Sequence, residues 1–319
     1  MIYMRFAVLT SGGDAPGMNA AIRAVVRTSL AGGHTIYGIY DGYRGLIEDK
    51  FHKMSRSDVS EILNRGGTIL GTARLPEFSE PSVQKMAIKQ LENRGIDGLI
   101  VIGGDGSYRG AMALCEAGIP CVGIPGTIDN DIANTDLTIG FSTALSTACD
   151  AIDKLRDTSS SHQRCSVIEV MGRDCGDLAL FSGICCGAEY IITKDTGLDK
   201  EHLLKSLKEN RLDGRRHAIV VIAENLTDSH ALAAEIEAYS GYECRATVLG
   251  YVQRGGIPTP EDRMLASRMG AYAVELLEKG IHGCAVSIHH NKLGYIEFAQ
   301  ALNHSKSSRE ILALVDKLQ

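Results

Sequence analysis

The chain lacks the features of a membrane protein or a broad nucleic-acid binder. No stretch approaches the roughly 18 consecutive apolar residues that a transmembrane helix needs. The formal net charge is −6 at pH 7, whereas nucleic acids and anionic membrane surfaces attract proteins with a basic surface. We therefore expect no nucleic-acid partner and no membrane partner. Any anion must be bound by a local group of arginines.

The nine cysteines lack the spacing of a metal site, since no Cys-x-x-Cys pair occurs and the adjacent Cys185 and Cys186 stand alone. No signal peptide precedes Met4, Arg5 and Phe6. We therefore expect reduced, buried thiols in a cytoplasmic protein.

Internal repeats, low-complexity tracts and long linkers are also missing. With 319 residues, the chain exceeds the roughly 250–300 residues at which a single core stops growing. Hydrophobic residues make up 44% of the chain and charged residues 23%, which is ordinary for a globular protein. We expect two α/β domains with no linker to mark the boundary.

A glycine-rich turn follows the first apolar run, at residues 6–9. Residues 10–19 read Thr-Ser-Gly-Gly-Asp-Ala-Pro-Gly-Met-Asn, and a helix with an apolar face follows. Gly12 and Gly13 would let the backbone approach a phosphate, and the helix would offer its N–H groups. The turn matches neither Gly-x-Gly-x-x-Gly nor the Gly-Lys-Ser/Thr loop, so a purely structural turn is the alternative.

Two more strand ends carry glycine and aspartate. The strand at 97–102 runs into Gly103-Gly104-Asp105-Gly106-Ser107, with a helix expected from about Tyr108, and the strand at 120–124 runs into residues 124–131. Ligands of open α/β sheets bind beyond the carboxyl ends of strands. We therefore expect these ends and the turn at 10–14 to meet at one sheet edge, with Asp105 as an oxygen ligand for Mg²⁺.

Asp129 and Asp131 are the most informative acidic pair. In an extended loop, residues two apart place both carboxylates on one side of the backbone. There they could hold Mg²⁺ and take a proton from a hydroxyl group. A solvated turn is the alternative.

Several arginines are candidate phosphate ligands. Arg23 and Arg27 are four residues apart on one helix face, although a solvated face is the alternative. Arg74 ends a glycine-rich loop. Arg164 and Arg173 flank the strand at 165–171 and stand close to 20 Å apart, since extended residues rise about 3.3 Å each, so one of them would serve a neighbouring subunit.

Further elements follow from apolar patterns. The predicted strands are 34–40 and 217–223, and the predicted helices are 81–94, 141 to about Arg156, Pro258 to about Lys279 and Ser307 to Lys317.

The glycine-rich segments together resemble the bacterial ATP-dependent 6-phosphofructokinase family. The shared segments, in the family's order, are residues 11–19, 103–107, 125–131, 171–173 and 253–256. The resemblance covers nearly the whole chain. It implies an enzyme that transfers the γ-phosphoryl group of ATP to the 1-hydroxyl of fructose 6-phosphate, giving fructose 1,6-bisphosphate and ADP in glycolysis.

The resemblance also implies roles for individual residues. The ATP-binding residues would be Gly13, Arg74, Leu75, Gly104, Asp105, Gly106 and Ser107, with Asp105 on Mg²⁺. The fructose 6-phosphate residues would be Thr127, Asp129, Arg164, Met171, Gly172, Arg173, Glu224, Arg245, Tyr251 and Arg254. Among them Asp129 would be the base and Thr127 its neighbour at the 1-hydroxyl. Asp131 would help to arrange the metal, and Arg173 would neutralise charge on the moving phosphoryl group. Arg164 and Arg245 would reach the 6-phosphate from the adjoining subunit.

The family's architecture is a fold of two similar three-layer α/β domains with largely parallel sheets. An ATP-binding domain would comprise residues 1–138 plus 253–303, and a fructose 6-phosphate-binding domain residues 139–252 plus 304–319. Sites shared between subunits imply a homotetramer. A regulatory pocket for ADP or phosphoenolpyruvate would contain Arg23, Arg27, Arg56, Arg156, Glu189, Arg215 and Arg216.

Three departures from the family's pattern bear on binding. Tyr251 stands where a histidine is usual, and a phenol cannot become cationic near neutral pH, so we expect a weaker or less pH-dependent grip on fructose 6-phosphate. Arg215 and Arg216 replace common lysines. Asp213 stands where the family often has a cation, so the sequence leaves open how strongly an effector acts.

Rival functions are less consistent with these residues. Pyrophosphate-dependent relatives tend to carry Asp and Lys where this chain has Gly106 and Gly126, so two glycines leave room for ATP. A nucleotide sensor without catalysis should have lost Asp105, Asp129 or Arg173. Lipid and NAD kinases share only the Gly-Gly-Asp-Gly loop.

Overall fold

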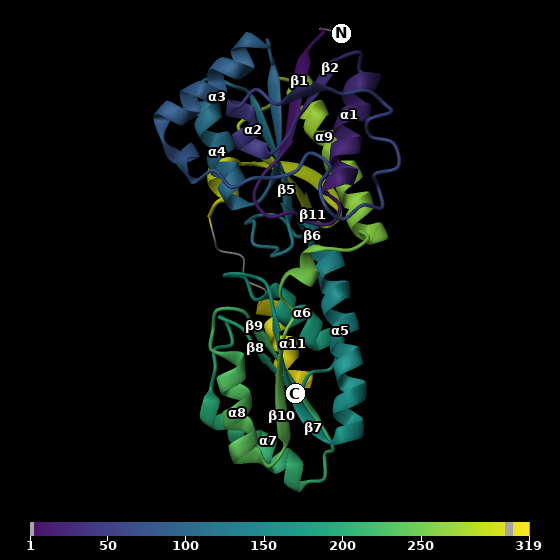
Figure 1. Ribbon diagram of the computed structural model, residues 1–319, viewed down its shortest axis with the longest axis vertical. Helices are drawn as coiled ribbons and strands as arrows, with labels where there is room; N and C mark the ends of the chain where they lie inside the picture. The colour runs from purple at the N-terminus through teal and green to yellow at the C-terminus, as the bar shows by residue number, and fades with distance from the viewer. Residues whose placement is uncertain (1–2, 304–308, 319) are drawn as a thin grey trace. The chain divides into compact units, whose positions relative to one another are not determined.

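The structure is a computed structural model that describes residues 3–303 and 309–318, and these divide into two compact units (Figure 1). Unit 1 contains residues 3–143 and 254–303, and unit 2 contains residues 144–253 and 309–318. The chain first passes from unit 1 to unit 2 in the opening turn of helix α5 (Phe141–His162), whereas the sequence places this transition at residue 138. A helix that continues across the boundary explains why no linker composition marks it.

Unit 1 is built on a mostly parallel sheet. The order of its strands is β12-β11-β5-β4-β1-β2-β3, and β6 pairs with β5. Only the outer pairs, β2 with β3 and β11 with β12, are antiparallel. The strands are β1 (Arg5–Thr10), β2 (Thr35–Ile39), β3 (Phe51–Lys53), β4 (Gly98–Gly103), β5 (Cys121–Thr127), β6 (Ile139–Gly140), β11 (Cys284–His289) and β12 (Lys292–Glu297).

Helices lie along this sheet, with α1 and α9 packed side by side (Figure 1). The helices of unit 1 are α1 (Met18–Ala31), α2 (Gly42–Ile47), α3 (Pro81–Asn93), α4 (Asp105–Glu116), α9 (Pro260–Glu278) and α10 (Phe298–Ala301), with a 3-10 turn η1 (Pro76–Ser79). A second 3-10 turn, η2 (Gly250–Arg254), leads the chain back into unit 1.

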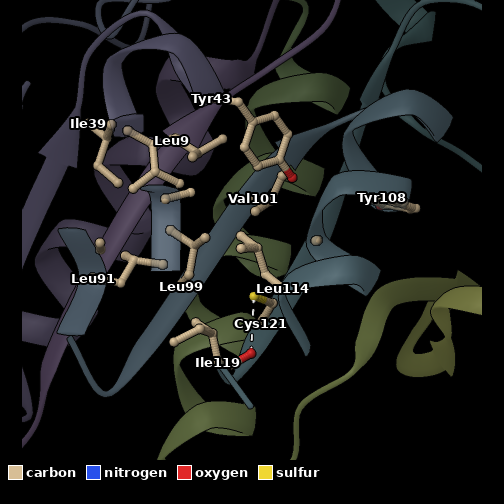
Figure 2. Packing of buried hydrophobic residues seen from close by; sticks show 14 of the residues in the cluster. Leu9, Ile39, Tyr43, Leu91, Leu99, Val101, Tyr108, Leu114, Ile119 and Cys121 are labelled. Carbon is tan, nitrogen blue, oxygen red and sulfur yellow. Dashed lines mark hydrogen bonds between the residues drawn. The ribbon is translucent and has the colours of Figure 1, made fainter. Parts of the chain in front are cut away.

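Successive apolar side chains of the strands point to opposite faces of the sheet, so both faces are packed. Figure 2 shows one face, where Leu99 and Val101 of β4 meet Leu91 of α3 and Leu114 of α4. These four side chains are fully buried, and burial of such a side chain stabilises the fold by about 1.5–3 kcal/mol. A parallel strand covered on both faces needs a continuous apolar run, which is what residues 99–102 provide.

Unit 2 repeats the arrangement on a smaller scale. Its four strands are all parallel in the order β10-β7-β9-β8. The strands are β7 (Arg164–Val170), β8 (Tyr190–Ile192), β9 (Ala218–Ala223) and β10 (Glu243–Val248), and the helices are α6 (Asp177–Cys185), α7 (Lys200–Leu212), α8 (Ser229–Ser240) and α11 (Arg309–Leu318). Apolar side chains of α7 and α8 pack on β7 and β9 in one core. The predicted α/β fold with largely parallel sheets is confirmed.

Several predicted boundaries are wrong. The helix expected to stop near Arg156 runs to His162, because Ser159 is buried there and its hydroxyl bonds Ser166 of β7 (2.7 Å). The helix expected from Tyr108 starts at Asp105. The strand expected to end at Ile124 continues to Thr127. The predicted start of the last helix, Ser307, lies outside the described residues.

A buried carboxylate fixes the start of α5. Asp262 of α9 is 1% exposed. Its Oδ1 accepts a hydrogen bond from the Gly140 amide (2.8 Å), and its Oδ2 accepts bonds from the Thr143 amide (2.8 Å) and the Thr143 hydroxyl (2.5 Å). The first amides of a helix have no partner within the helix, so Asp262 supplies acceptors that the local sequence lacks.

Replacing this carboxylate should destabilise the protein. In Asp262→Asn one acceptor becomes a donor that faces the Thr143 amide, and we expect a loss of about 1–3 kcal/mol in the free energy of unfolding. Urea titration of the variant measures this loss. The exposed neighbour provides a control, Glu261→Gln, which should change stability little.

The stabilising effect should also depend on pH. Burial, partly offset by the bonds from Thr143 and Gly140, raises the pKa of Asp262 above 3.8. The folded protein then binds the proton more tightly than the unfolded chain does. The advantage of wild type over Asp262→Asn should therefore shrink as pH rises from about 4 through the folded pKa. An advantage that grows over this range would contradict the assignment.

Candidate active site

The three glycine-bearing strand ends meet within unit 1. Strand β4 lies between β1 and β5, and all three run parallel. A β-carbon placed on Gly103 would lie 2.5 Å from the Ser11 carbonyl oxygen, and one on Gly104 would lie 3.7 Å from Cβ of Thr127. The turn after β1, the start of α4 and the end of β5 are therefore in contact, as the sequence predicts.

The turn after β1 brings a cation against the backbone. A β-carbon on Gly13 would lie 3.1 Å from Nη1 of Arg254, so no larger residue fits without moving the guanidinium. Gly12 has φ +85°, a conformation that favours glycine. The sequence assigns Gly13 to ATP and Arg254 to the sugar phosphate, and the structure places them side by side.

The start of α4 is open toward a ligand. Gly104 precedes the helix without a capping side chain, and Asp105 lies in the first turn. A β-carbon on Gly106 would meet nothing within 4 Å. The Ser107 side chain is buried, yet its hydroxyl has no hydrogen-bond partner among the described residues. Such a helix start with an unsatisfied hydroxyl suits a bound anion.

The segment after β5 is turned rather than extended. Asn130, between the two aspartates, has φ +54°, so the expectation of an extended loop is wrong. Its side-chain oxygen accepts a bond from the Thr138 amide (3.1 Å), which holds the turn in place. Thr127 Oγ1 accepts a bond from the Asp129 amide (3.2 Å). Asp129 is 9% exposed and lies two residues after Thr127.

Asp131 lies near the core. Its charge acts on Tyr108 of α4, and burial first and this charge second raise the pKa of the Tyr108 phenol. The Tyr108 ring is fully buried and packs against Phe298 with 5.4 Å between ring centroids. Asp131 itself is half-buried, so it lies within reach of this buried ring while part of it remains exposed.

Asn19 and Thr72, for which no separate role was predicted, hold the loop that ends at Arg74. Asn19 is fully buried; its amide nitrogen donates to the carbonyls of Arg65 (2.9 Å) and Gly67 (2.8 Å), and its oxygen accepts from the Ile69 amide (2.8 Å). The Thr72 hydroxyl donates to the Gly12 carbonyl (2.8 Å). The signal in the sequence that could have predicted this role is the polar Asn19 at the otherwise apolar start of α1.

Two residues predicted to bind ATP, Arg74 and Leu75, end this loop. The Arg74 carbonyl accepts a bond from Arg44 (3.3 Å). Leu75 is partly buried against the core of unit 1, so part of its role is packing.

In unit 2 a second turn presents an arginine. Gly172 (φ +140°) and Arg173 (φ +56°) follow β7 in the left-handed region. One carboxylate oxygen of Glu224 accepts bonds from the amides of Gly172 (3.2 Å) and Arg173 (2.8 Å). The Met171 amide donates to the fully buried Gln253 (3.2 Å), a residue whose role was not predicted. Glu224 and Gln253 thus set the backbone from which the exposed Arg173 extends.

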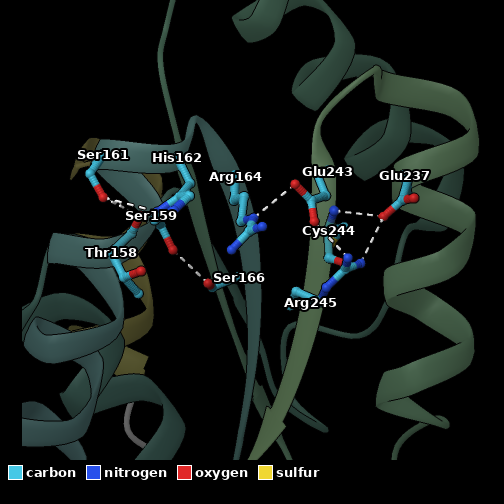
Figure 3. A network of polar contacts seen from close by, with 10 residues as sticks. All are labelled: Thr158, Ser159, Ser161, His162, Arg164, Ser166, Glu237, Glu243, Cys244 and Arg245. Atoms are coloured by element: carbon cyan, nitrogen blue, oxygen red, sulfur yellow. Dashed lines mark hydrogen bonds and ion pairs between the residues drawn. The ribbon is translucent and has the colours of Figure 1, made fainter.

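The opposite end of β7 carries a network of ion pairs (Figure 3). Glu243 lies beside Arg164 in the register of β10 and β7, and its carboxylate pairs with Arg164 (2.9 Å) and with Arg245 (2.6 Å). Arg245 also pairs with Glu237 of α8 (3.3 Å). The hydrogen bond from Arg164 is the largest cause that lowers the pKa of Glu243. The positive charges of Arg164 and then Arg245 lower it further. Arg164 begins β7 and Arg173 follows its end, so the two arginines stand at opposite ends of the strand as predicted.

Tyr251 extends from η2 and is 76% exposed. Val252 beside it is 62% exposed. β10, which precedes them, is an edge strand. Unpaired edges and exposed apolar side chains mark surfaces that associate with other chains.

The predicted effector residues divide between the units. In unit 1, Arg23 and Arg27 of α1 are half-buried and Arg56 is exposed. Burial first and Arg27 second lower the pKa of Arg23, and Nε of Arg27 is buried without a hydrogen bond among the described residues. Crowded cations of this kind favour a bound anion.

In unit 2 the effector candidates make backbone contacts. Arg156 donates to the carbonyls of Cys186 and Gly187. Glu189 accepts from the Ile219 amide (2.6 Å). The carbonyl of Arg215 accepts from the Tyr242 hydroxyl (2.8 Å), and Arg216 is exposed.

The described residues contain no group of three or more His, Cys, Asp or Glu side chains arranged to hold a metal ion. Asp105 alone at the start of α4 fits Mg²⁺, which in nucleotide sites is held by one or two carboxylates plus phosphate oxygens. Among the helices described, none is long and apolar enough to span a membrane.

Comparisons with known proteins agree with this geometry. The Phosphofructokinase family model matches residues 5–277. A protein of Photobacterium profundum named ATP-dependent 6-phosphofructokinase is 57% identical over 316 residues, covering 98% of this chain and 99% of its own. A protein of the same name from Vibrio cholerae serotype O1 is 57% identical over 302 residues, covering 95% of this chain and 94% of its own.

Solved structures show the same fold. A phosphofructokinase of Saccharomyces cerevisiae superposes with a TM-score of 0.87 at 34% identity, over 99% of this chain and 47% of that chain. A pyrophosphate-dependent phosphofructokinase of Marinobacter aquaeolei gives a TM-score of 0.84 at 20% identity, over 94% of this chain and 84% of its own, a likeness of fold alone. The family match and the identities over nearly full length show that the chain belongs to the phosphofructokinase family.

Proposed function

We propose that the protein transfers the γ-phosphoryl group of ATP to the 1-hydroxyl of fructose 6-phosphate, giving fructose 1,6-bisphosphate and ADP. The observation that carries this proposal is the meeting of three strand ends in unit 1. There Gly13, Gly104 and Gly106 leave the backbone accessible beside Asp105 and Asp129. The relatives with this activity in their names match the chain over nearly its whole length.

Unit 1 would bind the nucleotide. The start of α4 and the unsatisfied Ser107 hydroxyl are suited to phosphate oxygens. Arg74 and Leu75, on the loop that Asn19 and Thr72 hold, would contact the rest of ATP. Asp105 would hold Mg²⁺, which when bound neutralises charge on the phosphates.

The end of β5 would bind the acceptor hydroxyl. Asp129 would take its proton, and Thr127, whose hydroxyl oxygen accepts from the Asp129 amide, would orient both groups. Asp131, two residues further along the chain, would help to arrange the metal. Phosphoryl transfer depends on alignment and charge neutralisation more than on covalent chemistry, so a base together with the cationic Arg254 and Arg173 would suffice.

Unit 2 would hold most of the sugar phosphate through Met171, Gly172, Arg173 and Glu224. Arg164 and Arg245 stand at the other end of β7, so we propose that they reach the 6-phosphate of an adjoining subunit in a homotetramer. The edge strand β10, which carries Arg245, supports an interface along this side of the sheet. The weaker or less pH-dependent grip that Tyr251 implies stays a prediction.

A regulatory anion site is also proposed, for ADP or phosphoenolpyruvate. The crowded Arg23 and Arg27 support it most directly. Arg56, Arg156, Glu189, Arg215 and Arg216 would complete it across subunits. The nine free cysteines support the proposal of a cytoplasmic location, where thiols stay reduced.

ATP rather than pyrophosphate is the proposed donor. A side chain at Gly106 would enter open space, where the α-phosphate of ATP would lie. Gly126 has a different reason to be glycine, because a β-carbon there would lie 3.0 Å from Cε of Met18 and 3.1 Å from Cγ2 of Ile102. The proposed preference for ATP over pyrophosphate therefore rests on the open space at Gly106.

Release of ADP tests the proposed function directly. Purified protein should release ADP from ATP only when fructose 6-phosphate and Mg²⁺ are both present, and pyrophosphate should not replace ATP. ADP release without the sugar, or sugar phosphorylation from pyrophosphate alone, would contradict the proposal.

Removing the proposed base should affect turnover rather than binding. Asp129→Ser should lower kcat by about 10²–10⁴, the usual contribution of a positioned base, with KM for fructose 6-phosphate nearly unchanged. Steady-state kinetics measure both values. Asp195→Ser, at an exposed aspartate of unit 2, is the control and should behave as wild type. A variant within a few-fold of wild type would exclude Asp129 as the base.

Glu243 should compete with the 6-phosphate for the two arginines that it pairs with. Glu243→Gln keeps an acceptor but removes the charge, so KM for fructose 6-phosphate should fall roughly 1.5- to 5-fold, the small effect expected of exposed ion pairs. KM for ATP and kcat should not change. Glu235→Gln, which breaks the separate ion pair with Lys200, is the matched control. An unchanged or higher KM in Glu243→Gln would refute this competition.

A further inference from the structure

Six of the nine cysteines form three pairs of neighbouring thiols. The pairs, in each of which the two thiols lie close enough to shift the pKa of one another, are Cys115 with Cys121, Cys149 with Cys186, and Cys165 with Cys244. Cys121 and Cys165 are fully buried, so a reagent from solvent does not reach both members of the first and third pairs. In the part of the chain that the structure describes, the second pair alone has both members partly exposed.

Cys149 and Cys186 come from two helices of unit 2. Cys149 lies on α5, and Cys186 directly follows α6, with its amide bonded to the Ser182 carbonyl (3.0 Å). The Cys186 thiol also reaches the Cys149 carbonyl, with 3.8 Å between Sγ and the oxygen. The side chain of Cys186 therefore points at the backbone and the thiol of Cys149.

Contact between the two thiols makes the two sulfurs unequal. It is the largest cause that lowers the pKa of Cys186; burial and the Asp153 carboxylate oppose it, and the Arg156 guanidinium lowers this pKa by less than Asp153 raises it. The same contact, with burial, raises the pKa of Cys149. A thiolate rather than a thiol attacks an electrophile, so Cys186 is the better nucleophile of the pair.

Arg156 keeps Cys186 in place. Its guanidinium donates to the carbonyls of Cys186 and Gly187, which fixes the chain just beyond α6. Cys149, Asp153 and Arg156 all lie on helix α5, so one helix carries the partner thiol and both charged groups that act on Cys186.

We propose that Cys149 and Cys186 form a dithiol that reacts with hydroperoxides and closes to a reversible disulfide. The Cys186 thiolate attacks one peroxide oxygen, the O–O bond breaks, and the leaving oxygen takes a proton to become water or an alcohol. Cys186 is then a sulfenic acid. The Cys149 sulfur attacks the Cys186 sulfur, the S–O bond breaks, and the oxygen leaves as water with the Cys149 proton. The two sulfurs lose two electrons and the peroxide gains them.

This modification site does not depend on the proposed kinase activity, because no residue of the proposed catalytic group takes part. A dithiol reductant would restore both thiols by exchange. The adjacent Cys185 is exposed and acts on Cys149 through its charge but not through a hydrogen bond, which makes it the matched control.

Peptide mapping after hydrogen peroxide treatment tests the proposal. The full-length protein should lose two thiols, yield a peptide cross-linked between Cys149 and Cys186, and recover both thiols with dithiothreitol. Cys185→Ser should react as wild type. Cys186→Ser should lose thiols about tenfold more slowly, since it lacks the favoured thiolate. Cys149→Ser should stop at a sulfenic acid that dimedone labels at position 186.

Two results would overturn the proposal. One is a cross-link that involves Cys185 in place of Cys186. The other is thiol loss in Cys186→Ser as fast as in wild type. Thermal unfolding of each variant before oxidation shows whether it is folded. If Cys186→Ser is unfolded, Cys186→Ala repeats the test with a smaller, apolar side chain.

Discussion

Close backbone contact at the ends of three parallel strands is the constraint on which the candidate site depends. Gly103 must lack a side chain because the Ser11 carbonyl occupies the space that a β-carbon would need. A side chain at Gly13 would displace the Arg254 guanidinium, which lies 3.1 Å from the position of a β-carbon there. These contacts bring the turn after β1, the start of α4 and the end of β5 within the reach of one polyphosphate. The glycines thus let the backbone proposed to bind phosphate lie close to the segments that carry the carboxylates Asp105 and Asp129.

Charge is arranged locally in this acidic protein. Several of its arginines contact carboxylates: Glu243 pairs with Arg164 and Arg245, and Glu224 accepts a bond from the backbone amide of the exposed Arg173. Arg23 and Arg27 face each other. A phosphate carries more negative charge than a carboxylate and matches the guanidinium fork, so an anion can displace these acidic partners or fill the gap between cations.

The sequence predicts the parts of the fold that local patterns determine. Apolar runs identified β1, β4 and β7, and the rule that ligands bind beyond parallel strand ends predicted that residues 10–14, 103–107 and 124–131 meet. Long-range contacts escaped prediction. Asn130 turns the chain because Thr138 binds its side chain, and α5 extends past Arg156 because Ser159 bonds Ser166. Asn19, Gln253 and Glu243 act on segments far away in sequence, and no spacing between them reveals the partner.

The central claim is that one site in unit 1 binds the phosphates of the nucleotide beside the acceptor hydroxyl. A crystal structure of the protein with Mg²⁺, ADP and fructose 1,6-bisphosphate tests it most directly. The account predicts the ADP phosphates at Gly13 and residues 104–107, the metal on Asp105, and the sugar's 1-phosphate next to Thr127 and Asp129. Phosphates bound elsewhere, or Asp129 turned away from the sugar, would contradict it.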